Sequence, residues 1–279
     1  MSTELLSRLD DWARERQIWP KEFHCPHYEE CNKEALHLER GYTCGMSYVG
    51  QEYGEPELAP GKPFRLVIVG IDPGANYEEK KLEGFIESQK GIETWYYGTE
   101  TKFNQHYRGV IRTAAAVLGR DGKHCLEHCY QESKCVGGRK RPNGKRCVLR
   151  SFVQPNLVKC AGGPDRQTRS GAVMLKNCPQ YLVSELEVLK PDLIVFHGAK
   201  AQWAFPNVLP EGYDSVPLPD SPKQGNFSVI QKLTTADLGS ECFILYLHHP
   251  SHGCLNRQWG RVVEPALKLL RSKGAIPPL

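Results

Sequence analysis

The stretch that decides the fold is RLVIVGIDPG, residues 65–74, in which an unbroken apolar run ends in Asp, Pro and Gly. A run without polar alternation is typical of a parallel strand that is buried on both faces. Two further runs have the same character, DLIVFH at 192–197 and CFILYL at 242–247. Helical patterns separate the runs, so the sequence predicts an α/β fold, a three-layer sandwich with a central, mainly parallel sheet.

The remaining elements are expected around these strands. A further strand fits residues 151–158, although Pro155 indicates a bend within it. The Gly- and Pro-rich stretch 50–63 is interpreted as a loop. Pro265 is expected to kink the C-terminal helix. Helical patterns occupy residues 5–16, 104–119, 179–189, 198–205 and 256–272.

Length and composition indicate one large domain. The 279 residues, 40% of them hydrophobic, suffice for a sizeable core. We expect residues 1–279 to form a single, monomeric domain with a Cys/His segment at 24–44 and a Cys- and Arg-rich insertion at 120–149. No run approaches the length of an apolar membrane span, and the N-terminal stretch is charged throughout. We therefore expect a cytoplasmic protein without a membrane partner.

Basic residues are concentrated in one part of the chain. The net charge is only +4, but residues 133–164 contain no Asp or Glu and many Lys and Arg, among them Arg139, Lys140 and Arg141. Such a run supplies the sequence-independent part of affinity for DNA. A solvated surface loop is the alternative interpretation of the same run.

Polar residues follow three of the predicted strands, at the point where each strand ends. The three segments are GIDPG at 70–74, NLVKC at 156–160 and HHPSHG at 248–253. In an open α/β sheet the ligand site lies at the carboxyl ends of the strands. Each segment alone is most simply a turn. Together they predict one site at this edge of the sheet.

In this order, the three segments resemble the motifs of the uracil-DNA glycosylase superfamily. Residues 70–74 look like its water-activating motif, and HPS at 249–251 looks like its second catalytic motif. Residues 156–160 are similar to the base-recognition strand of the branch that carries an iron–sulfur cluster. The segments CPQYL at 178–182, LKPD at 189–192 and HGAKA at 197–201 match that branch as well. The resemblance covers about residues 64–272 without the insertion.

The resemblance implies a DNA glycosylase that flips a pyrimidine nucleotide and hydrolyses its N-glycosidic bond, leaving an abasic site. Asp72 would orient or deprotonate a water and stabilise the cationic sugar. His249 would donate a hydrogen bond to the base O2, and Asn156 would read the pyrimidine edge. Phe85, with Phe103 as the alternative, would stack on the flipped base.

The first motif departs from its relatives in a way that bears on the substrate. Uracil-specific members place a Tyr after Asp-Pro, and its ring closes the pocket against groups at C5 of the pyrimidine. Gly74 stands at that position here and opens the space, although a tight turn also favours glycine. The superfamily includes anti-phage enzymes that remove hypermodified bases, so glucosylated hydroxymethylcytosine in phage DNA is the expected substrate.

The segment after the second motif departs too. The wedge Leu of the uracil-specific branch would fall at Gly253, which leaves Leu255 as the candidate wedge, assisted by Arg257. Ser251, from the motif itself, is expected to contact DNA.

Eleven cysteines in a reducing compartment point to metal ligands or buried thiols rather than disulfides. Cys160 and Cys178 stand where the cluster-bearing branch has two ligands of a [4Fe-4S] cluster. That branch takes two more from an N-terminal pair, for which this chain offers Cys25, Cys31 and Cys44.

A second, separate group of four cysteines is interpreted as the ligands of a structural zinc ion. An extended strand would separate Cys147 from Cys160 by about 30 Å or more, so the two groups would not share a metal. Nearby histidines are alternative ligands, and buried thiols remain the alternative for both groups. The four cysteines are Cys125, Cys129, Cys135 and Cys147.

Other functions stay open at this point. Within the same class, the protein would be a uracil-DNA glycosylase of base-excision repair. In a different class, it would be a non-catalytic binder of modified DNA, although such a protein has no need of a carboxylate like that of Asp72. A metal-stabilised nucleic-acid-binding module would explain the basic run but not the three strand-end segments.

Overall fold

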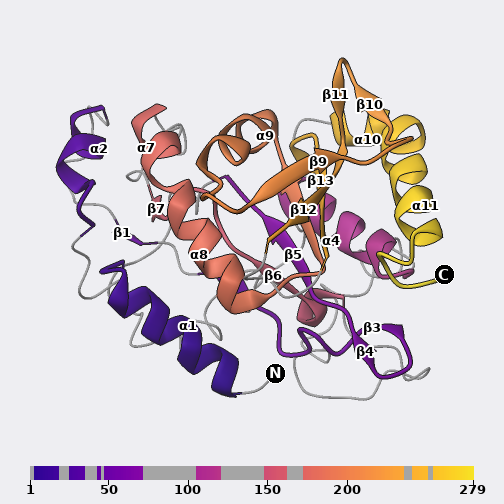
Figure 1. Ribbon diagram of the computed structural model, residues 1–279, viewed down its shortest axis with the longest axis horizontal. Helices are drawn as coiled ribbons and strands as arrows, with labels where there is room; N and C mark the ends of the chain where they lie inside the picture. Colours follow the sequence, from indigo (N-terminus) through magenta and orange to yellow (C-terminus); the bar gives the residue numbers. More distant parts are fainter. Residues whose placement is uncertain are drawn as a thin grey trace.

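The computed structural model describes residues 3–18, 25–34, 43–44, 47–71, 105–120, 148–161, 172–235, 241–250 and 254–279. Within these residues, the main feature is a seven-stranded sheet in the order β2-β6-β5-β8-β13-β12-β9 (Figure 1). Its strands are β2 (Tyr48–Val49), β5 (Leu66–Val69), β6 (Phe152–Gln154), β8 (Leu193–His197), β9 (Asp214–Pro217), β12 (Ile230–Thr234) and β13 (Cys242–Leu247).

The four central strands of the sheet are parallel, as the apolar runs predict. Strand β6 pairs with β5, β5 with β8, and β8 with β13, all in parallel. The strands outside them, β2 on one side and β12 and β9 on the other, pair antiparallel. Every residue of β5, β8 and β13 is buried, because helices cover both faces of the sheet (Figure 1). The predicted α/β class with a parallel centre is confirmed.

The direction of the crossovers between strands determines which helix lies on which face of the sheet. The chain passes from β5 to β6 through α4 (Gln105–Val117) and from β6 to β8, in the opposite direction across the sheet, through α8 (Pro179–Leu189). Right-handed crossovers in opposite directions place these helices on opposite faces. Helix α1 (Thr3–Glu15) packs on α8, and α11 (Glu264–Ser272) is tied to α4 by Arg271 and the Ala116 carbonyl.

Several expected elements differ in extent. The strand expected at 151–158 is regular only over β6, after a 3₁₀ turn at Leu149–Ser151, because Pro155 lacks the N–H that would continue the ladder. The spacing expected between Cys147 and Cys160 stays a prediction, because Cys147 lies outside the described residues. The stretch 50–63, expected as a loop, contains the hairpin β3 (Glu57–Ala59) and β4 (Lys62–Pro63).

The C-terminal helix is interrupted rather than simply kinked. It consists of α10 (Cys254–Gln258), a π-helical turn (Trp259–Val263) and α11, and Pro265 lies at the start of α11. A proline is tolerated there because the first N–H groups of a helix have no partner within it.

Smaller elements complete the description. They are α2 (Tyr28–Glu34), α7 (Ala172–Asn177), α9 (Ala199–Ala204), a 3₁₀ turn (Pro206–Val208), the hairpin β10 (Lys223–Gln224) and β11 (Phe227–Ser228), and the pair β1 (Thr43–Cys44) and β7 (Cys160–Ala161). None of the described helices has the length and apolar character needed to cross a membrane.

Candidate active site

The ends of β5 and β6 lie side by side. Gly70 and Asn156 form a parallel bridge just beyond the two strands. The Gly70 N–H donates to the Pro155 carbonyl at 2.9 Å, and the Gly70 carbonyl accepts from the Leu157 N–H at 2.9 Å. A Cβ on Gly70 would lie 2.7 Å from Asn156 Oδ1, so only glycine leaves room for this amide. The first and second strand-end segments are therefore joined at one edge of the sheet.

The end of β8 brings the first and third segments together. Gly198 has a φ of 107°, which favours glycine, and its N–H donates to the Leu247 carbonyl at 2.8 Å. A Cβ at Gly198 would lie 2.9 Å from Ile71 Cδ1 and 3.8 Å from His249 Cδ2. Ile71 and His249 thus both lie close to the same backbone position. Since Ile71 immediately precedes Asp72, the two predicted catalytic segments meet here.

Helix α4 covers the second catalytic motif. A Cβ on Gly109 would lie only 2.1 Å from Pro250 Cβ, so the helix and the loop are in direct contact. The His106 ring, one turn earlier, lies with its centroid 5.2 Å from that of His249. Burial, and to a smaller extent the nearby His249, lower the pKa of His106 to about 4. His106 is therefore neutral near neutral pH.

A second histidine, His197 at the end of β8, is also held neutral. The Thr113 hydroxyl donates to the Gly109 carbonyl at 2.9 Å and lies 3.3 Å from His197 Nε2. Because its only proton is used in the first bond, the Thr113 oxygen accepts from a protonated Nε2. Burial, and to a smaller extent the neighbouring His106 and His249, lower the pKa of His197 to about 3.

These lowered pKa values predict that acid destabilises the fold. Below pH about 6.5, the usual pKa of histidine, His197 binds a proton in the unfolded chain but not in the folded protein. The free energy of unfolding therefore decreases as the pH is lowered from about 6.5 towards the pKa of folded His197. The expected loss from His197 is about 2 kcal/mol between pH 7 and pH 5. Urea unfolding at the two pH values measures it. His197→Gln should reduce this pH dependence, and equal slopes in wild type and His197→Gln would contradict the assignment.

Behind Asn156, the chain is anchored by a buried ion pair. The Lys159 ammonium, 2% exposed, contacts the fully buried Glu185 carboxylate on α8, which also accepts a hydrogen bond from the Ser47 hydroxyl. Removing one partner of such a pair leaves an uncompensated buried charge, so the pair holds the segment firmly. Lys159 belongs to the basic run of residues 133–164, but its burial means that it does not contribute to a DNA-binding surface.

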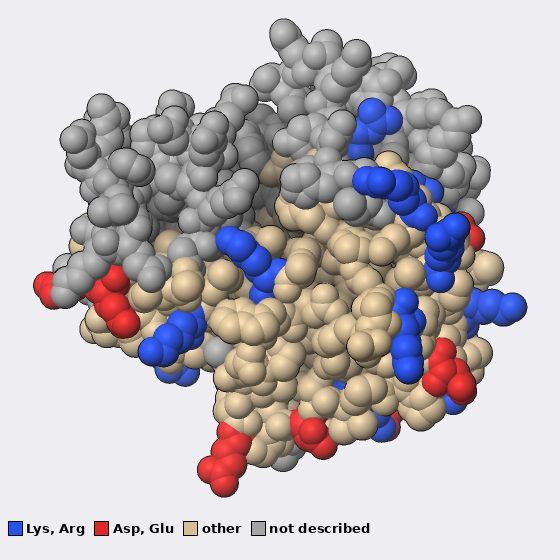
Figure 2. All heavy atoms as spheres, turned by 90° about the horizontal axis from the view of Figure 1, so that it is seen from above, with Lys and Arg blue, Asp and Glu red and all other residues tan. Residues whose placement is uncertain are grey.

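Leu255 and Arg257, which follow the second predicted motif, have contrasting environments. Leu255 is 2% exposed and lies in the hydrophobic core, so it is not available as a wedge between base pairs. The burial of Leu255 argues against the expected wedge, because α10 turns this side chain inward. Arg257, on the same helix, is exposed. Seen from above, Lys and Arg side chains gather on the side where α10 and α11 lie (Figure 2).

Cysteines from separate segments come near one another beside α8. Cys25, Cys31 and Cys178 are buried. Burial raises the pKa of the Cys31 thiol to about 11; a hydrogen bond from Asn177 lowers it, and the nearby Cys178 and Cys25 raise it. Among the side chains that the structure describes, no three His, Cys, Asp or Glu form a metal-binding group.

The β1–β7 pair adds two cysteines to this part of the fold. Its antiparallel register places Cys44 directly opposite Cys160. Cys25, Cys31, Cys44, Cys160 and Cys178 are the cysteines expected at the first metal site, which stays a prediction.

Several predicted site residues lie outside the described part of the chain and stay predictions. They are Asp72, Gly74, Phe85, Phe103, Ser251, Arg139, Lys140, Arg141, Cys125, Cys129, Cys135 and Cys147. Sequence reasoning missed His106 and His197. His197 ends an apolar strand and was detectable by the same strand-end rule, whereas the contact of His106 with His249 depends on how α4 packs.

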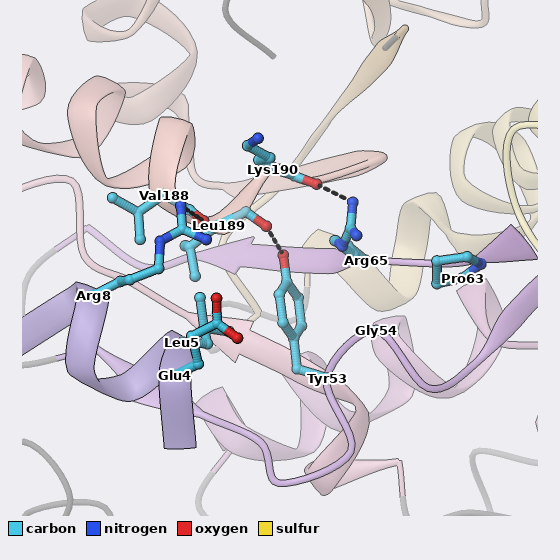
Figure 3. A pocket seen from close by; sticks show the side chains of 10 residues that line it. All are labelled: Glu4, Leu5, Arg8, Tyr53, Gly54, Pro63, Arg65, Val188, Leu189 and Lys190. Carbon is cyan, nitrogen blue, oxygen red and sulfur yellow. Dashed lines mark hydrogen bonds between the residues drawn. The ribbon is translucent and has the colours of Figure 1, made fainter. Parts of the chain in front are cut away.

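A separate cavity of about 330 Å³ lies near the amino ends of the strands (Figure 3). The residues around it mainly cap α8, whose last carbonyls accept hydrogen bonds from Tyr53, Arg65 and Arg8. Lys190 ends the helix with a left-handed φ of 49°. The cavity is thus an opening beside a helix end, remote from the strand-end segments.

The comparison with known families agrees with this geometry. A family model described as the uracil DNA glycosylase superfamily matches residues 59–271, a range that includes all three strand-end segments. No curated protein matches the chain. The match covers most of the sequence and corresponds closely to the stretch in which the motifs were found, so the chain belongs to the uracil-DNA glycosylase superfamily.

Proposed function

We propose that the protein is a monofunctional DNA glycosylase that extrudes a pyrimidine nucleotide and hydrolyses its N-glycosidic bond. The observation that carries this proposal is the meeting of three strand ends: Asn156 lies beside Gly70, and both His249 and Ile71 lie beside Gly198. Membership of the superfamily suggests the activity, and DNA as the partner. A duplex hides its bases, so catalysis requires base flipping.

The roles divide according to where charge develops. As the glycosidic bond breaks, the sugar gains positive charge and the base departs with negative charge. Asp72, next to Ile71, stabilises the sugar and directs a water to its C1′. His249 donates a hydrogen bond to O2 of the departing base. His106 and His197 are neutral neighbours of His249, so they add no positive charge around it.

The proposed substrate is a cytosine with a large group at C5, such as glucosylated hydroxymethylcytosine in phage DNA. Gly74 supports this, because it lacks the ring that closes the pocket of uracil-specific relatives. The site would serve antiviral defence in the cytoplasm. Uracil removal in repair is the alternative within the same class, and a non-catalytic binder of modified DNA is the alternative outside it.

Gly74→Tyr tests the substrate proposal. The ring should abolish release of the glucosylated base, because it occupies the space for the C5 group, while any release of uracil is spared. Abasic sites are scored in duplexes that contain either base at one position. Gly61→Tyr, at an exposed turn with open space, is the control for a glycine-to-tyrosine change; because its φ of 74° favours glycine, the fold of this variant is checked by its Tm. If the wild type removes uracil and ignores every 5-substituted pyrimidine, repair is the better assignment.

We also propose an architectural [4Fe-4S] cluster held by Cys160, Cys178 and two of the three N-terminal cysteines. The buried thiols of Cys25, Cys31 and Cys178 and the pairing of Cys44 with Cys160 support this proposal, because such a cluster requires soft sulfur donors. The cluster would supply structural cross-linking, since bond hydrolysis needs no redox change. The four inserted cysteines, Cys125, Cys129, Cys135 and Cys147, are proposed as a structural zinc site.

Metal analysis of purified protein tests this cofactor assignment. Wild-type protein should be brown and contain about four iron atoms per chain, the content of one cubane cluster. Cys178→Ser should lose the colour and the iron. Cys242→Ser removes another buried thiol, on β13, and should retain both. Colourless protein with about two zinc equivalents, one for each proposed four-ligand site, would replace the cluster by a second zinc.

A further inference from the structure

One buried amide beneath the proposed base site has an oxygen that accepts no hydrogen bond from the described residues. Gln154 lies on β6, two residues before Asn156, and is 5% exposed. The register of β5 and β6 places Ile68 beside it, and β2 places Tyr48 on its other side. A polar side chain in this otherwise apolar row is unexpected, because a leucine of similar size would fill the same space.

The Gln154 side chain extends along the strand towards the active-site edge. Its Nε2 lies 3.7 Å from the point that a Cβ on Gly70 would occupy, and Asn156 Oδ1 lies 2.7 Å from the same point. Two amides from one strand therefore converge over Gly70. The amino group of Gln154 faces the side where the Asn156 oxygen lies, which is the favourable orientation of the two dipoles.

This orientation leaves the other end of Gln154 unused. Its Oε1 is buried and, in the described structure, accepts no hydrogen bond. Most buried acceptors in proteins are satisfied, and an exception at a binding site calls for an explanation. At this edge of the sheet, the simplest explanation is that the ligand supplies the hydrogen-bond donor.

Pyrimidines differ in the group that they would bring to this acceptor. Cytosine carries a 4-amino group, which is a donor, whereas uracil carries an oxygen, which is a second acceptor. With Asn156 Oδ1 turned towards Gly70, the Asn156 amino group is the part left to meet the ring, and cytosine N3 accepts from it. Donor and acceptor from the two amides thus match the edge of cytosine and not that of uracil.

We propose that Gln154 is a specificity-determining residue, whose amide oxygen accepts a hydrogen bond from the 4-amino group of a cytosine-type base. The proposal rests on the proposed glycosylase function and narrows its substrate class. It does not depend on the size of the C5 group, which concerns Gly74.

A matched pair of substrates isolates the group at C4. Duplexes containing glucosylated hydroxymethylcytosine or glucosylated hydroxymethyluracil carry the same C5 group and differ only at the edge read by the amides. Wild-type protein should release the cytosine-type base faster. Gln154→Leu should lower kcat/KM for the cytosine-type base by about 5- to 150-fold, the effect of one lost buried hydrogen bond, and leave the uracil-type rate unchanged. Gln154→Met is a second variant of similar volume.

Thermal unfolding separates a ligand-reading role from a structural one. Because Oε1 has no hydrogen-bond partner within the part of the chain that the structure describes, Gln154→Leu should keep or raise Tm. Gln231→Leu is the matched control: this strand glutamine is also buried, but its oxygen accepts from the Ser215 hydroxyl at 2.5 Å. It should lower Tm and leave the ratio of the two rates unchanged.

Two results would overturn the assignment while the glycosylase function stands. One is equal or faster release of the uracil-type base by wild type. The other is an equal loss on both substrates in Gln154→Leu and Gln154→Met. Release of no pyrimidine by folded wild-type protein would overturn the proposed function itself, and Gln154 would then have no base to read.

Discussion

Asp72→Asn should lower the rate of base release by about 10²–10⁴-fold, the usual effect of removing a positioned acid or base. The reason is that asparagine keeps the shape of the side chain but neither deprotonates water nor stabilises the developing charge on the sugar. Affinity for the DNA should change little, because the carboxylate acts on the reacting bond. Single-turnover release under saturating enzyme and a separate binding titration measure the two quantities.

A second aspartate provides the control for this variant. Asp192 accepts a hydrogen bond from the Arg65 N–H at 2.7 Å, near the amino ends of the strands. Asp192→Asn should therefore affect stability at most and leave the single-turnover rate unchanged. Full activity in Asp72→Asn would remove Asp72 from its proposed role.

His249→Ala should lower the rate by about 10²–10³-fold, since a donor to a developing anion acts mainly in the transition state. His249 is suited to this by its position: it lies beside Gly198, as Ile71 does, and against the His106 ring. His248→Ala is the matched control. His248 is half-buried and contacts Gln224 of β10, away from this contact, and its loss should leave the rate nearly unchanged.

Binding measurements distinguish catalysis from folding in this pair. His249→Ala should bind the substrate duplex with nearly the affinity of wild type. A normal rate in His249→Ala, with a slow His248→Ala or His252→Ala, would transfer the role of base donor to a neighbouring histidine.

The centre of the sheet was predictable because its strands are long apolar runs. Residues 66–69, 193–197 and 242–247 have no polar alternation, and burial on both faces requires that pattern. The edge strands β2 and β9 were not predicted. β2 has only two residues, and β9 is mostly exposed and ends in Pro217, so neither carries a strong hydrophobic signal.

The site was predictable to the extent that it follows from strand ends. Parallel strands finish at the same edge, so Gly70, Asn156 and His249 had to lie near one another once the strands were known. Contacts that depend on helix packing could not be predicted from the sequence. The contact of His106 with His249 requires the close approach of Gly109 to Pro250, which no spacing in the sequence indicates.

Two further features could not be predicted well from the sequence, the irregular strand at 151–158 and the direction of the Leu255 side chain. Gln154 and Pro155 weakened the strand pattern at 151–158, because a polar side chain and a proline both disfavour a central strand. Leu255 was expected at the DNA surface from its distance to the second motif, but the turn of α10 directs it into the core. Side-chain direction on a short helix depends on packing that a motif does not encode.

The central claim is that the protein breaks an N-glycosidic bond, and free base is its direct product. A duplex with one glucosylated hydroxymethylcytosine, and a matched one with uracil, are incubated with wild type and Asp72→Asn. Mass spectrometry measures the released base, and alkaline cleavage measures the abasic strand. Wild type should yield free base and abasic strand in equal amounts from at least one duplex, and Asp72→Asn should yield neither at the same time point. Tight binding by wild type to DNA that keeps every base would contradict the claim and favour a non-catalytic binder.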